Sequence, residues 1–479
     1  MTRVMRTVVV RSVKLSRKVF RIFVELEGMY RNMLEQLVLY ASKNLIWSFT
    51  KLKSLKYREL RAMYPQLPSH YAYTACQDAA TRVKSFYRCK VNQLAEEIFE
   101  KSAKGLRGGV KKLRRGEKRY LYRRAYMEAR RRVEKEMREG RLKPEVRKAT
   151  IWLDDHLWKL DSLTSIKITT HKGWILVGFE PHKHYWRYVN RGWQFASEIK
   201  VRLDRRKRQL VIYLTFVKNV EECKARGFLP VDVNENNVTI LIDDKPYLLE
   251  TDIEKIVLGY YYRRKRIQEK YDELYGKKSR IKRKIMRKLK ERKKKLDVRR
   301  KIANLIVKVV YENRCVIVLE KLGKRAANNM LTRIKDKQLR HRIFQAGFKG
   351  VQKAIEKKAK EYGVPVIYVD PKDTSKTCPI HNAPITYKNG SRIGKCSKGG
   401  ELWHRDVVAC WNLLLKALQG DGSNAPSPVG RVFLDGSLVP LGSTATHDPI
   451  TLPKGLWARW KSLLLTRINT KTTKMMQKG

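Results

Sequence analysis

Residues 228–243 read FLPVDVNENNVTILID, and this stretch decides the fold of the C-terminal half of the chain. Two apolar, β-branched runs flank a polar turn, a pattern that predicts a hairpin of two buried strands. The first run contains the carboxylate of Asp232. An acidic side chain is costly inside a protein core unless a partner compensates its charge. Asp232 is therefore a candidate ligand of a buried cation.

Two further acids lie in contexts of the same kind. Glu320 ends the run CVIVLE, which predicts a short buried strand, and Asp406 begins an amphipathic helix in HRDVVACWNLL. Predicted strands and helices alternate over 228–370, which indicates a layered α/β core. A pair of divalent metal ions compensates buried carboxylates and hydrolyses phosphodiesters. The alternative is that the acids have ordinary structural roles, with Asp232 in a turn, Glu320 at the start of a surface helix and Asp406 as an N-cap.

The composition indicates a polyanionic partner. Lys and Arg number 107 against 46 Asp and Glu, a formal net charge of +61 over 479 residues. Such self-repulsion destabilises a compact chain unless a polyanion neutralises it, and DNA or RNA does so through counterion release. A ribosome-associated or membrane-surface protein is the alternative. No apolar run approaches the ~20 residues that span a bilayer, so we expect no membrane partner, and the N-terminus does not read as a signal peptide.

The segments around the core have patterns of their own. Strand-like runs over 150–227, together with an alternating N-terminal strand in 1–18, predict a small β-barrel. Residues 19–149 interrupt this barrel with helical, strongly basic sequence. Residues 420–479 read as a linker followed by a basic tail. The sequence thus predicts a multidomain α/β protein with a β-barrel and a helical insertion.

The three acidic motifs resemble the TnpB (OrfB) family of transposon-encoded, RNA-guided DNA nucleases, to which compact type V CRISPR effectors are related. VDVNENNVTI, IVLEKL and the block from DPKDTSKTCPIH to HRDVVACWNLL carry the match, in order and spacing. The resemblance implies an RNase H-like (RuvC-like) nuclease core over 228–370 and 406–419. It also implies that the barrel is wedge-like, that residues 19–149 are recognition helices, and that 371–405 form a zinc-knuckle-like insert.

The resemblance further implies partners and chemistry. The partners would be a guide RNA derived from the transposon end and a double-stranded DNA target next to a short flanking motif, in a cytoplasmic, nucleoid-associated protein. The catalytic acids would be Asp232, Glu320 and Asp406, holding two Mg²⁺ ions with Asp232 as the bridging ligand, since Mg²⁺ favours carboxylate, water and phosphate oxygens. The family usually has Asn where Val408 stands. A nuclease-inactive DNA-binding protein therefore stays open as an alternative. A compact CRISPR effector with the same chemistry is a further alternative.

Cys378, His381 and Cys396 have the spacing of a zinc knuckle, and zinc takes N and S ligands in a tetrahedron. The family's second pair is usually CxxC, but here CSKGGELWH places Gly399 and Gly400 at the expected ligand positions. His404 is the nearest substitute and would give a Cys₂His₂ site. A three-ligand site completed by water and a knuckle without zinc are the alternatives.

Candidate nucleic-acid contacts fall in two groups. By resemblance, Gln77, Thr74 and Lys84 on a predicted helix are candidates to read the flanking motif, because amide side chains suit adenine. Arg405 either contacts the scissile phosphate or pairs with the adjacent acid, and we favour the pairing. Basic runs would line channels for an RNA–DNA heteroduplex and guide scaffold, recognised by shape and backbone. These runs are 111–115, 263–266, 277–284 and 287–300.

Overall fold

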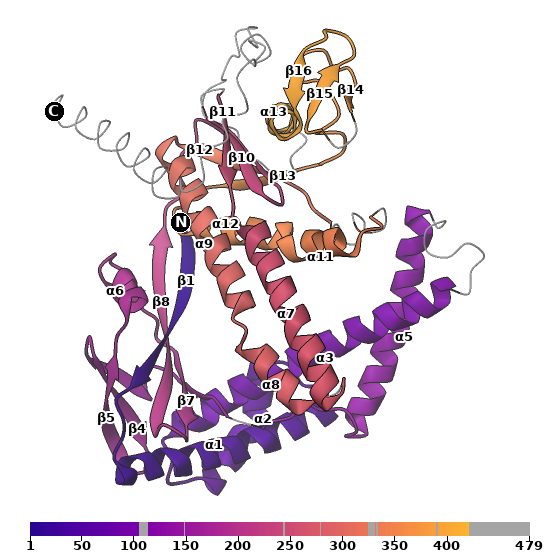
Figure 1. The fold of residues 1–479 in the computed structure, drawn as a ribbon. Helices are drawn as coiled ribbons and strands as arrows, with labels where there is room; N and C mark the ends of the chain where they lie inside the picture. The colour runs from indigo at the N-terminus through magenta and orange to yellow at the C-terminus, as the bar shows by residue number, and fades with distance from the viewer. Residues whose placement is uncertain are drawn as a thin grey trace, which may run out of the picture. The chain divides into compact units, whose positions relative to one another are not determined.

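The structure is a computed structural model, and it describes residues 1–104, 114–147, 149–242, 245–277, 279–323, 331, 334–388 and 391–420. The chain divides into two compact units, one of Met5–Lys218 and one of Met1–Val4 with Asn219–Gly479 (Figure 1). Residues 111–113 of the first predicted basic run, and the predicted linker and tail beyond Gly420, lie outside the described residues. The finer division into domains stays a prediction.

The first unit contains a nearly closed eight-stranded sheet in the order β2-β7-β8-β1-β5-β4-β3, with β6 paired to β8. The N-terminal strand β1 (Thr2–Ser12) lies in the middle of this order, because its alternate residues Val4, Val8 and Val10 are buried. The other strands are β2 (Ile151–Leu153), β3 (Trp158–Ser162), β4 (Ser165–Thr170), β5 (Gly173–Glu180), β6 (Gln194–Phe195), β7 (Ile199–Asp204) and β8 (Gln209–Val220). A short helix, α6 (Lys183–Val189), follows β5.

Within the described residues, the insertion between β1 and β2 contains four long helices. They are α1 (Arg17–Lys43), α2 (Phe49–Met63), α3 (Ser69–Lys104) and α5 (Arg115–Arg138). Helices α1 and α2 begin after serine caps, Ser16 and Ser48, whose side chains accept hydrogen bonds from backbone N–H groups. Helix α3 packs against α1, α2 and α5. The basic helical insertion predicted from the sequence is therefore present.

The second unit is built on a five-stranded sheet in the order β11-β10-β9-β12-β13. The predicted hairpin is confirmed, since β9 and β10 pair antiparallel, and β10 pairs antiparallel with β11. Strand β12 runs parallel to β9, and β13 parallel to β12. The strands are β9 (Gly227–Val233), β10 (Asn237–Ile242), β11 (Lys245–Glu250), β12 (Cys315–Glu320) and β13 (Val366–Val369).

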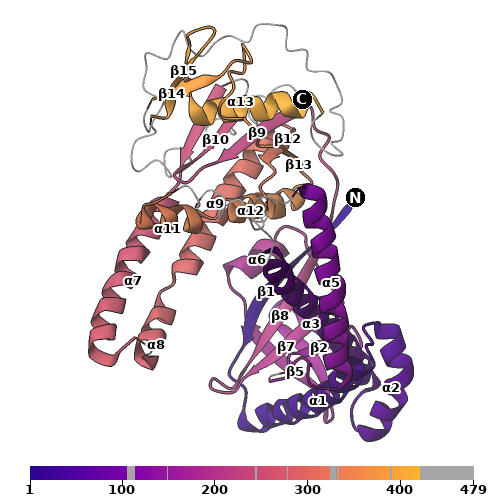
Figure 2. The same cartoon turned by 90° about the vertical axis from the view of Figure 1, so that its right-hand side faces the viewer.

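Helices cover both faces of this sheet (Figure 2). The described helices of this unit are α7 (Ile253–Tyr275), α8 (Arg280–Lys288), α9 (Glu291–Glu312), α11 (Lys337–Ala346), α12 (Phe348–Lys360) and α13 (Arg405–Leu418). Side chains of β9, β10 and β12 pack with α9 and α12 in one buried cluster, whereas α13 packs on the opposite face. Gly347, with φ of 61°, separates α11 from α12.

A small three-stranded antiparallel sheet precedes α13. It is formed by β14 (Ile385–Tyr387), β15 (Ile393–Cys396) and β16 (Leu402–His404). Its buried residues Ile385 and Trp403 share a cluster with Val408 and Trp411 of α13. The insert and α13 therefore pack as one layer on the sheet. Within the described residues, no helix is both long and apolar enough to cross a membrane.

Candidate active site

Strand alternation places two of the three acids on the same face of the sheet. In β12, Ile317 and Leu319 point into the cluster with α9 and α12, so Val316, Val318 and Glu320 face α13. In β9, Leu229 and Val231 point to the α9 side, so Asp232 also faces α13. Leu319 pairs with Val231 in the parallel register, which puts Glu320 beside Asp232.

The third acid comes from α13 itself. Asp406 lies in the first turn of this helix, which packs against β9, β10 and β12. The side chains of Asp232 and Asp406 are only 5% and 4% exposed, and Glu320 is half-buried. The fold therefore directs three carboxylates from two strands and one helix into the same layer.

Two asparagines of the hairpin turn hold these carboxylates. Asn234 Nδ2 donates to Asp232 Oδ2 at 2.7 Å, and Asn237 Nδ2 donates to Asp406 Oδ2 at 3.0 Å. Asn234 Nδ2 also lies 3.3 Å from Asn237 Oδ1. The turn thus links the first acid to the third across the sheet. Neither asparagine was among the site residues predicted from the sequence.

The acids perturb one another electrostatically. Burial raises the pKa of Asp232 well above its ordinary range, and the charges of Glu320 and Asp406 raise it further. Burial also raises the pKa of Glu320, against the hydrogen bond from Thr374 and the charges of Lys416 and Arg405. Two carboxylates that cannot both ionise cheaply favour a cation between them. This is the electrostatic signature of a metal or catalytic site.

Glu320 is positioned through the start of the insert. Thr374 Oγ1 donates to Glu320 Oε1 at 3.3 Å, and Gln352 Nε2 donates to the Glu320 carbonyl at 2.9 Å. Asn412 of α13 donates to the carbonyls of Thr374 and Thr377 at 2.7 and 2.8 Å. Asn412 therefore orders the loop that supports the second acid.

An arginine of the insert, rather than the arginine adjacent in sequence, pairs with the third acid. Arg392 Nη1 lies 2.6 Å from Asp406 Oδ2. The ion pair that we favoured for Arg405 is thus made by Arg392. The Arg405 charge instead lowers the pKa values of Asp232 and Glu320. Arg392 was missed because it lies fourteen positions before Asp406 and only the pairing of β15 with β16 brings it close.

The ligand oxygens of the three acids do not form one close cluster. Within the part of the chain that the structure describes, two groups of His, Cys, Asp and Glu have ligand atoms that all lie within 4.8 Å of one another, and the acid trio is not one of them. The trio offers only carboxylate oxygens, Asp232 and Asp406 are buried, and the pKa values of Asp232 and Glu320 are raised. Such oxygen donors suit a hard cation such as Mg²⁺.

The first close group differs from the predicted set of zinc ligands. It consists of Cys378, His381, Cys396 and Glu401. His404, which we predicted as the fourth ligand, is not part of it and is instead the N-cap of α13. Sequence reasoning chose His404 as the nearest histidine and missed Glu401. The second group, His70, Asp154 and His156, lies in the other unit.

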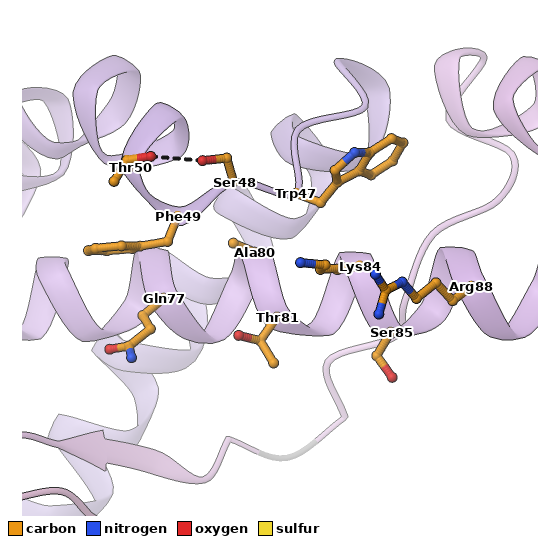
Figure 3. A pocket seen from close by; sticks show the side chains of 10 residues that line it. All are labelled: Trp47, Ser48, Phe49, Thr50, Gln77, Ala80, Thr81, Lys84, Ser85 and Arg88. Carbon is orange, nitrogen blue, oxygen red and sulfur yellow. Dashed lines mark hydrogen bonds between the residues drawn. The ribbon is translucent and has the colours of Figure 1, made fainter. Parts of the chain in front are cut away.

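A cavity of about 850 Å³ lies on the exposed side of α3 (Figure 3). Gln77 and Lys84 line it together with Arg88, opposite Trp47, which precedes α2, and Phe49, the first residue of α2. Trp47 stacks on Tyr87 with a centroid separation of 4.4 Å. The cavity therefore combines amide and cationic groups with aromatic rings.

Thr74, which we expected on this surface, is fully buried on the other side of α3. Its hydroxyl donates to the Tyr71 carbonyl within the same helix, at 3.3 Å. Gln77 lies only three positions later, but the inner stripe of α3 includes Tyr71, Thr74, Ala75 and Asp78. The expectation that Thr74 reaches a base edge is wrong for this reason.

Two family models match the chain. Residues 348–413 match the model described as "Cas12f1-like, TNB domain", and residues 26–97 match the model described as "Uncharacterized protein MJ0013 family". The first match spans α12, β13, the three-stranded insert and most of α13, including Asp406. The second falls on the helical insertion.

Individual relatives extend these matches. The TnpB-like protein MJ0751 of Methanocaldococcus jannaschii is 31% identical over 219 residues, covering 43% of this chain and 74% of that protein. The uncharacterized protein MJ0857 of the same organism is 22% identical over 284 residues, covering 56% of this chain and 88% of that protein. The solved structure titled "Cryo-EM structure of the Cas12f1-sgRNA-target DNA complex" aligns over 86% of this chain and 98% of that chain, with a TM-score of 0.45 and 16% identity.

Proposed function

Because the chain belongs to the TnpB family, which is related to the type V effectors, we propose that it is an RNA-guided DNA endonuclease of an insertion-sequence transposon. It would cut double-stranded DNA next to a short flanking motif. The observation that carries the proposal is the convergence of Asp232, Glu320 and Asp406 on one face of the five-stranded sheet. We further propose that this sheet and its helices form an RNase H-like, RuvC-like core.

In this proposal, Asp232, Glu320 and Asp406 hold two Mg²⁺ ions. Such ions, when bound, would activate a water, neutralise charge at the phosphorus and stabilise the leaving oxygen. The side chains of Asn234 and Asn237 keep the carboxylates of Asp232 and Asp406 oriented. Burial of both acids keeps bulk water away from their oxygens and strengthens every charge interaction in the site.

The cavity on α3 is the proposed reader of the flanking motif. Gln77 presents an amide that suits a base edge, and Lys84 and Arg88 present charges that suit the phosphate backbone. Basic helices α7, α8 and α9 of the second unit would contact the guide RNA and heteroduplex. Helix α8, of sequence RIKRKIMRK, has no buried residue and can offer its charges to a backbone.

A nuclease-inactive, RNA-guided DNA-binding protein is the second candidate. It is favoured by Val408, an apolar residue where the family has Asn, and by the Arg392 ion pair that occupies Asp406. A compact CRISPR effector would share the chemistry of the first candidate. A neighbouring repeat array in the genome would distinguish it.

One experiment tests the proposal. RNA that co-purifies with the full-length protein is sequenced, and a plasmid library with a matching target and randomised flanks is incubated with the complex and Mg²⁺. We expect cleavage next to one enriched flank, and loss of cleavage in Asp232→Asn with RNA binding retained. Target binding without cleavage in the wild-type complex would establish the second candidate. The absence of a defined co-purifying RNA would overturn both.

A further inference from the structure

Four side chains of the insert form a cluster with the dimensions of a tetrahedral metal site. His381 Nδ1 lies 3.7 Å from Cys378 Sγ, 3.6 Å from Cys396 Sγ and 3.5 Å from Glu401 Oε2. Zinc binds S at about 2.3 Å and N or O at about 2.1 Å, so a tetrahedron around it has S···N edges of about 3.6 Å and an N···O edge of about 3.4 Å. The observed distances match these edges.

One carboxylate oxygen of Glu401 lacks a hydrogen bond that would explain its position. Its Oε2 atom is buried, and no hydrogen bond satisfies it. A buried carboxylate oxygen without a partner costs about 1–3 kcal/mol or more. The oxygen nevertheless faces His381, and the thiols of Cys378 and Cys396 are 1% and 2% exposed. A cation between these groups would remove the cost.

The neighbouring Gly399 gives an independent observation. A methyl group at this position would overlap both the Glu401 carboxylate and the His381 ring. Its N–H group faces Cys396 Sγ at 3.5 Å, which suits a thiolate ligand. The glycine therefore leaves empty the volume that Glu401 fills. An alanine there would push two of the four donors out of place.

The cluster of His70, Asp154 and His156 has shorter contacts than the four side chains of the insert, and this difference supports a metal ion in the insert. His70 Nδ1 lies 2.7 Å from Asp154 Oδ2, which is a hydrogen-bond distance and shorter than the ~3.4 Å edge of a zinc tetrahedron. The rings of His70 and His156 also stack face to face, with centroids 3.8 Å apart. Those residues satisfy one another directly, whereas the four donors of the insert are spaced for an ion.

We propose that Cys378, His381, Cys396 and Glu401 bind one zinc ion, with Glu401 as the fourth ligand in place of His404. Thiolate and imidazole donors select zinc over Mg²⁺. Four protein donors leave no open position, so the site is structural. The ion would fasten the turn at 378–381 to β15 and to the turn before β16. This inference does not depend on the proposed nuclease activity.

The test measures zinc in the full-length protein and its variants. Purified wild type should contain one zinc per chain by mass spectrometry of the metal. Glu401→Ala should weaken zinc binding at least about 100-fold in competition with a chromophoric chelator, the upper end of what loss of a supporting residue alone costs. The matched variant His404→Ala should keep wild-type affinity. Full zinc retention in Glu401→Ala, or loss in His404→Ala, would overturn the assignment.

Cobalt substitution and a rescue variant distinguish the loss of a metal ligand from misfolding of the variant. Co²⁺ in the wild-type site should give the visible absorption of tetrahedral cobalt with two thiolates, and this spectrum should change in Glu401→Ala but not in His404→Ala. The rescue variant Glu401→Cys supplies a thiol in place of the carboxylate and leaves Gly399 unchanged. It should regain one zinc and a spectrum with a third thiolate. An unchanged Co²⁺ spectrum in Glu401→Ala would also refute the proposal.

Discussion

Asn412→Ala should make the position of Glu320 less well ordered, although Asn412 does not contact Glu320 directly. The Asn412 amide is 9% exposed and donates to two carbonyls, those of Thr374 and Thr377. Thr374 in turn donates to Glu320. The substitution removes both donors and leaves two poorly solvated carbonyls, each costing about 1–3 kcal/mol. We therefore expect a loss of about 2–6 kcal/mol in the local stability of the 371–378 loop.

Hydrogen exchange followed by mass spectrometry reads this local stability directly. Peptides from the 371–378 loop and α13 should exchange faster in Asn412→Ala, while peptides from β9 and α9 keep their wild-type rates. Cleavage should fall with the guide RNA still bound, because Glu320 loses its oriented partner. The matched control is Leu418→Ala, an exposed position on the same helix.

Two results would refute this reasoning. Unchanged exchange in the 371–378 loop of Asn412→Ala would show that the two hydrogen bonds do not hold it. Accelerated exchange with wild-type cleavage would show that Thr374 does not position Glu320.

Three further predictions concern the acids and the cavity. The pKa values of Asp232 and Glu320 are raised, so in the folded, metal-free chain these acids keep protons that the unfolded chain releases above about pH 4. The free energy of unfolding therefore falls as the pH rises above that value. In thermal melts without Mg²⁺, Asp232→Asn should therefore gain stability over wild type increasingly from pH 5 to 8; a constant difference contradicts the burial argument. Arg392→Gln should lower the Mg²⁺ concentration at half-maximal thermal stabilisation, because its guanidinium competes for Asp406; a higher midpoint would rule out competition. Lys84→Ala should reduce the salt slope of DNA binding by about 0.9 per lost phosphate contact, whereas Thr74→Val should leave it unchanged, and equal effects would contradict the placement of these residues on opposite sides of α3.

The sequence was informative wherever local periodicity sets direction. The alternation in FLPVDV and CVIVLE predicts two strands and, once they pair in parallel register, places Asp232 beside Glu320. The helical period of α3 could also have separated buried Thr74 from exposed Lys84. The strand alternation and the buried stripe of α3 each depend on a few neighbouring residues and on burial of one face of the strand or helix.

Features set by turns and by pairing between distant segments were not predictable in this way. Glu401 reaches the metal cluster because the 397–400 turn, with Gly400 at φ of 78°, reverses the chain. Arg392 reaches Asp406 through pairing of β15 with β16. Asn237 is one of three asparagines in a short turn, and only the packing of α13 selects it for Asp406. Residue type alone favoured His404 and Arg405 instead.

The pairing of Arg392 with Asp406 has a practical bearing on protein engineering. The arm between 371 and 405 looks like a cassette that could be exchanged among relatives. A chimera that exchanges only residues 371–405 would replace Arg392, the ion-pair partner of Asp406. It would also replace the loop whose carbonyls accept hydrogen bonds from Asn412. Successful swaps should carry the whole of α13 along with the arm.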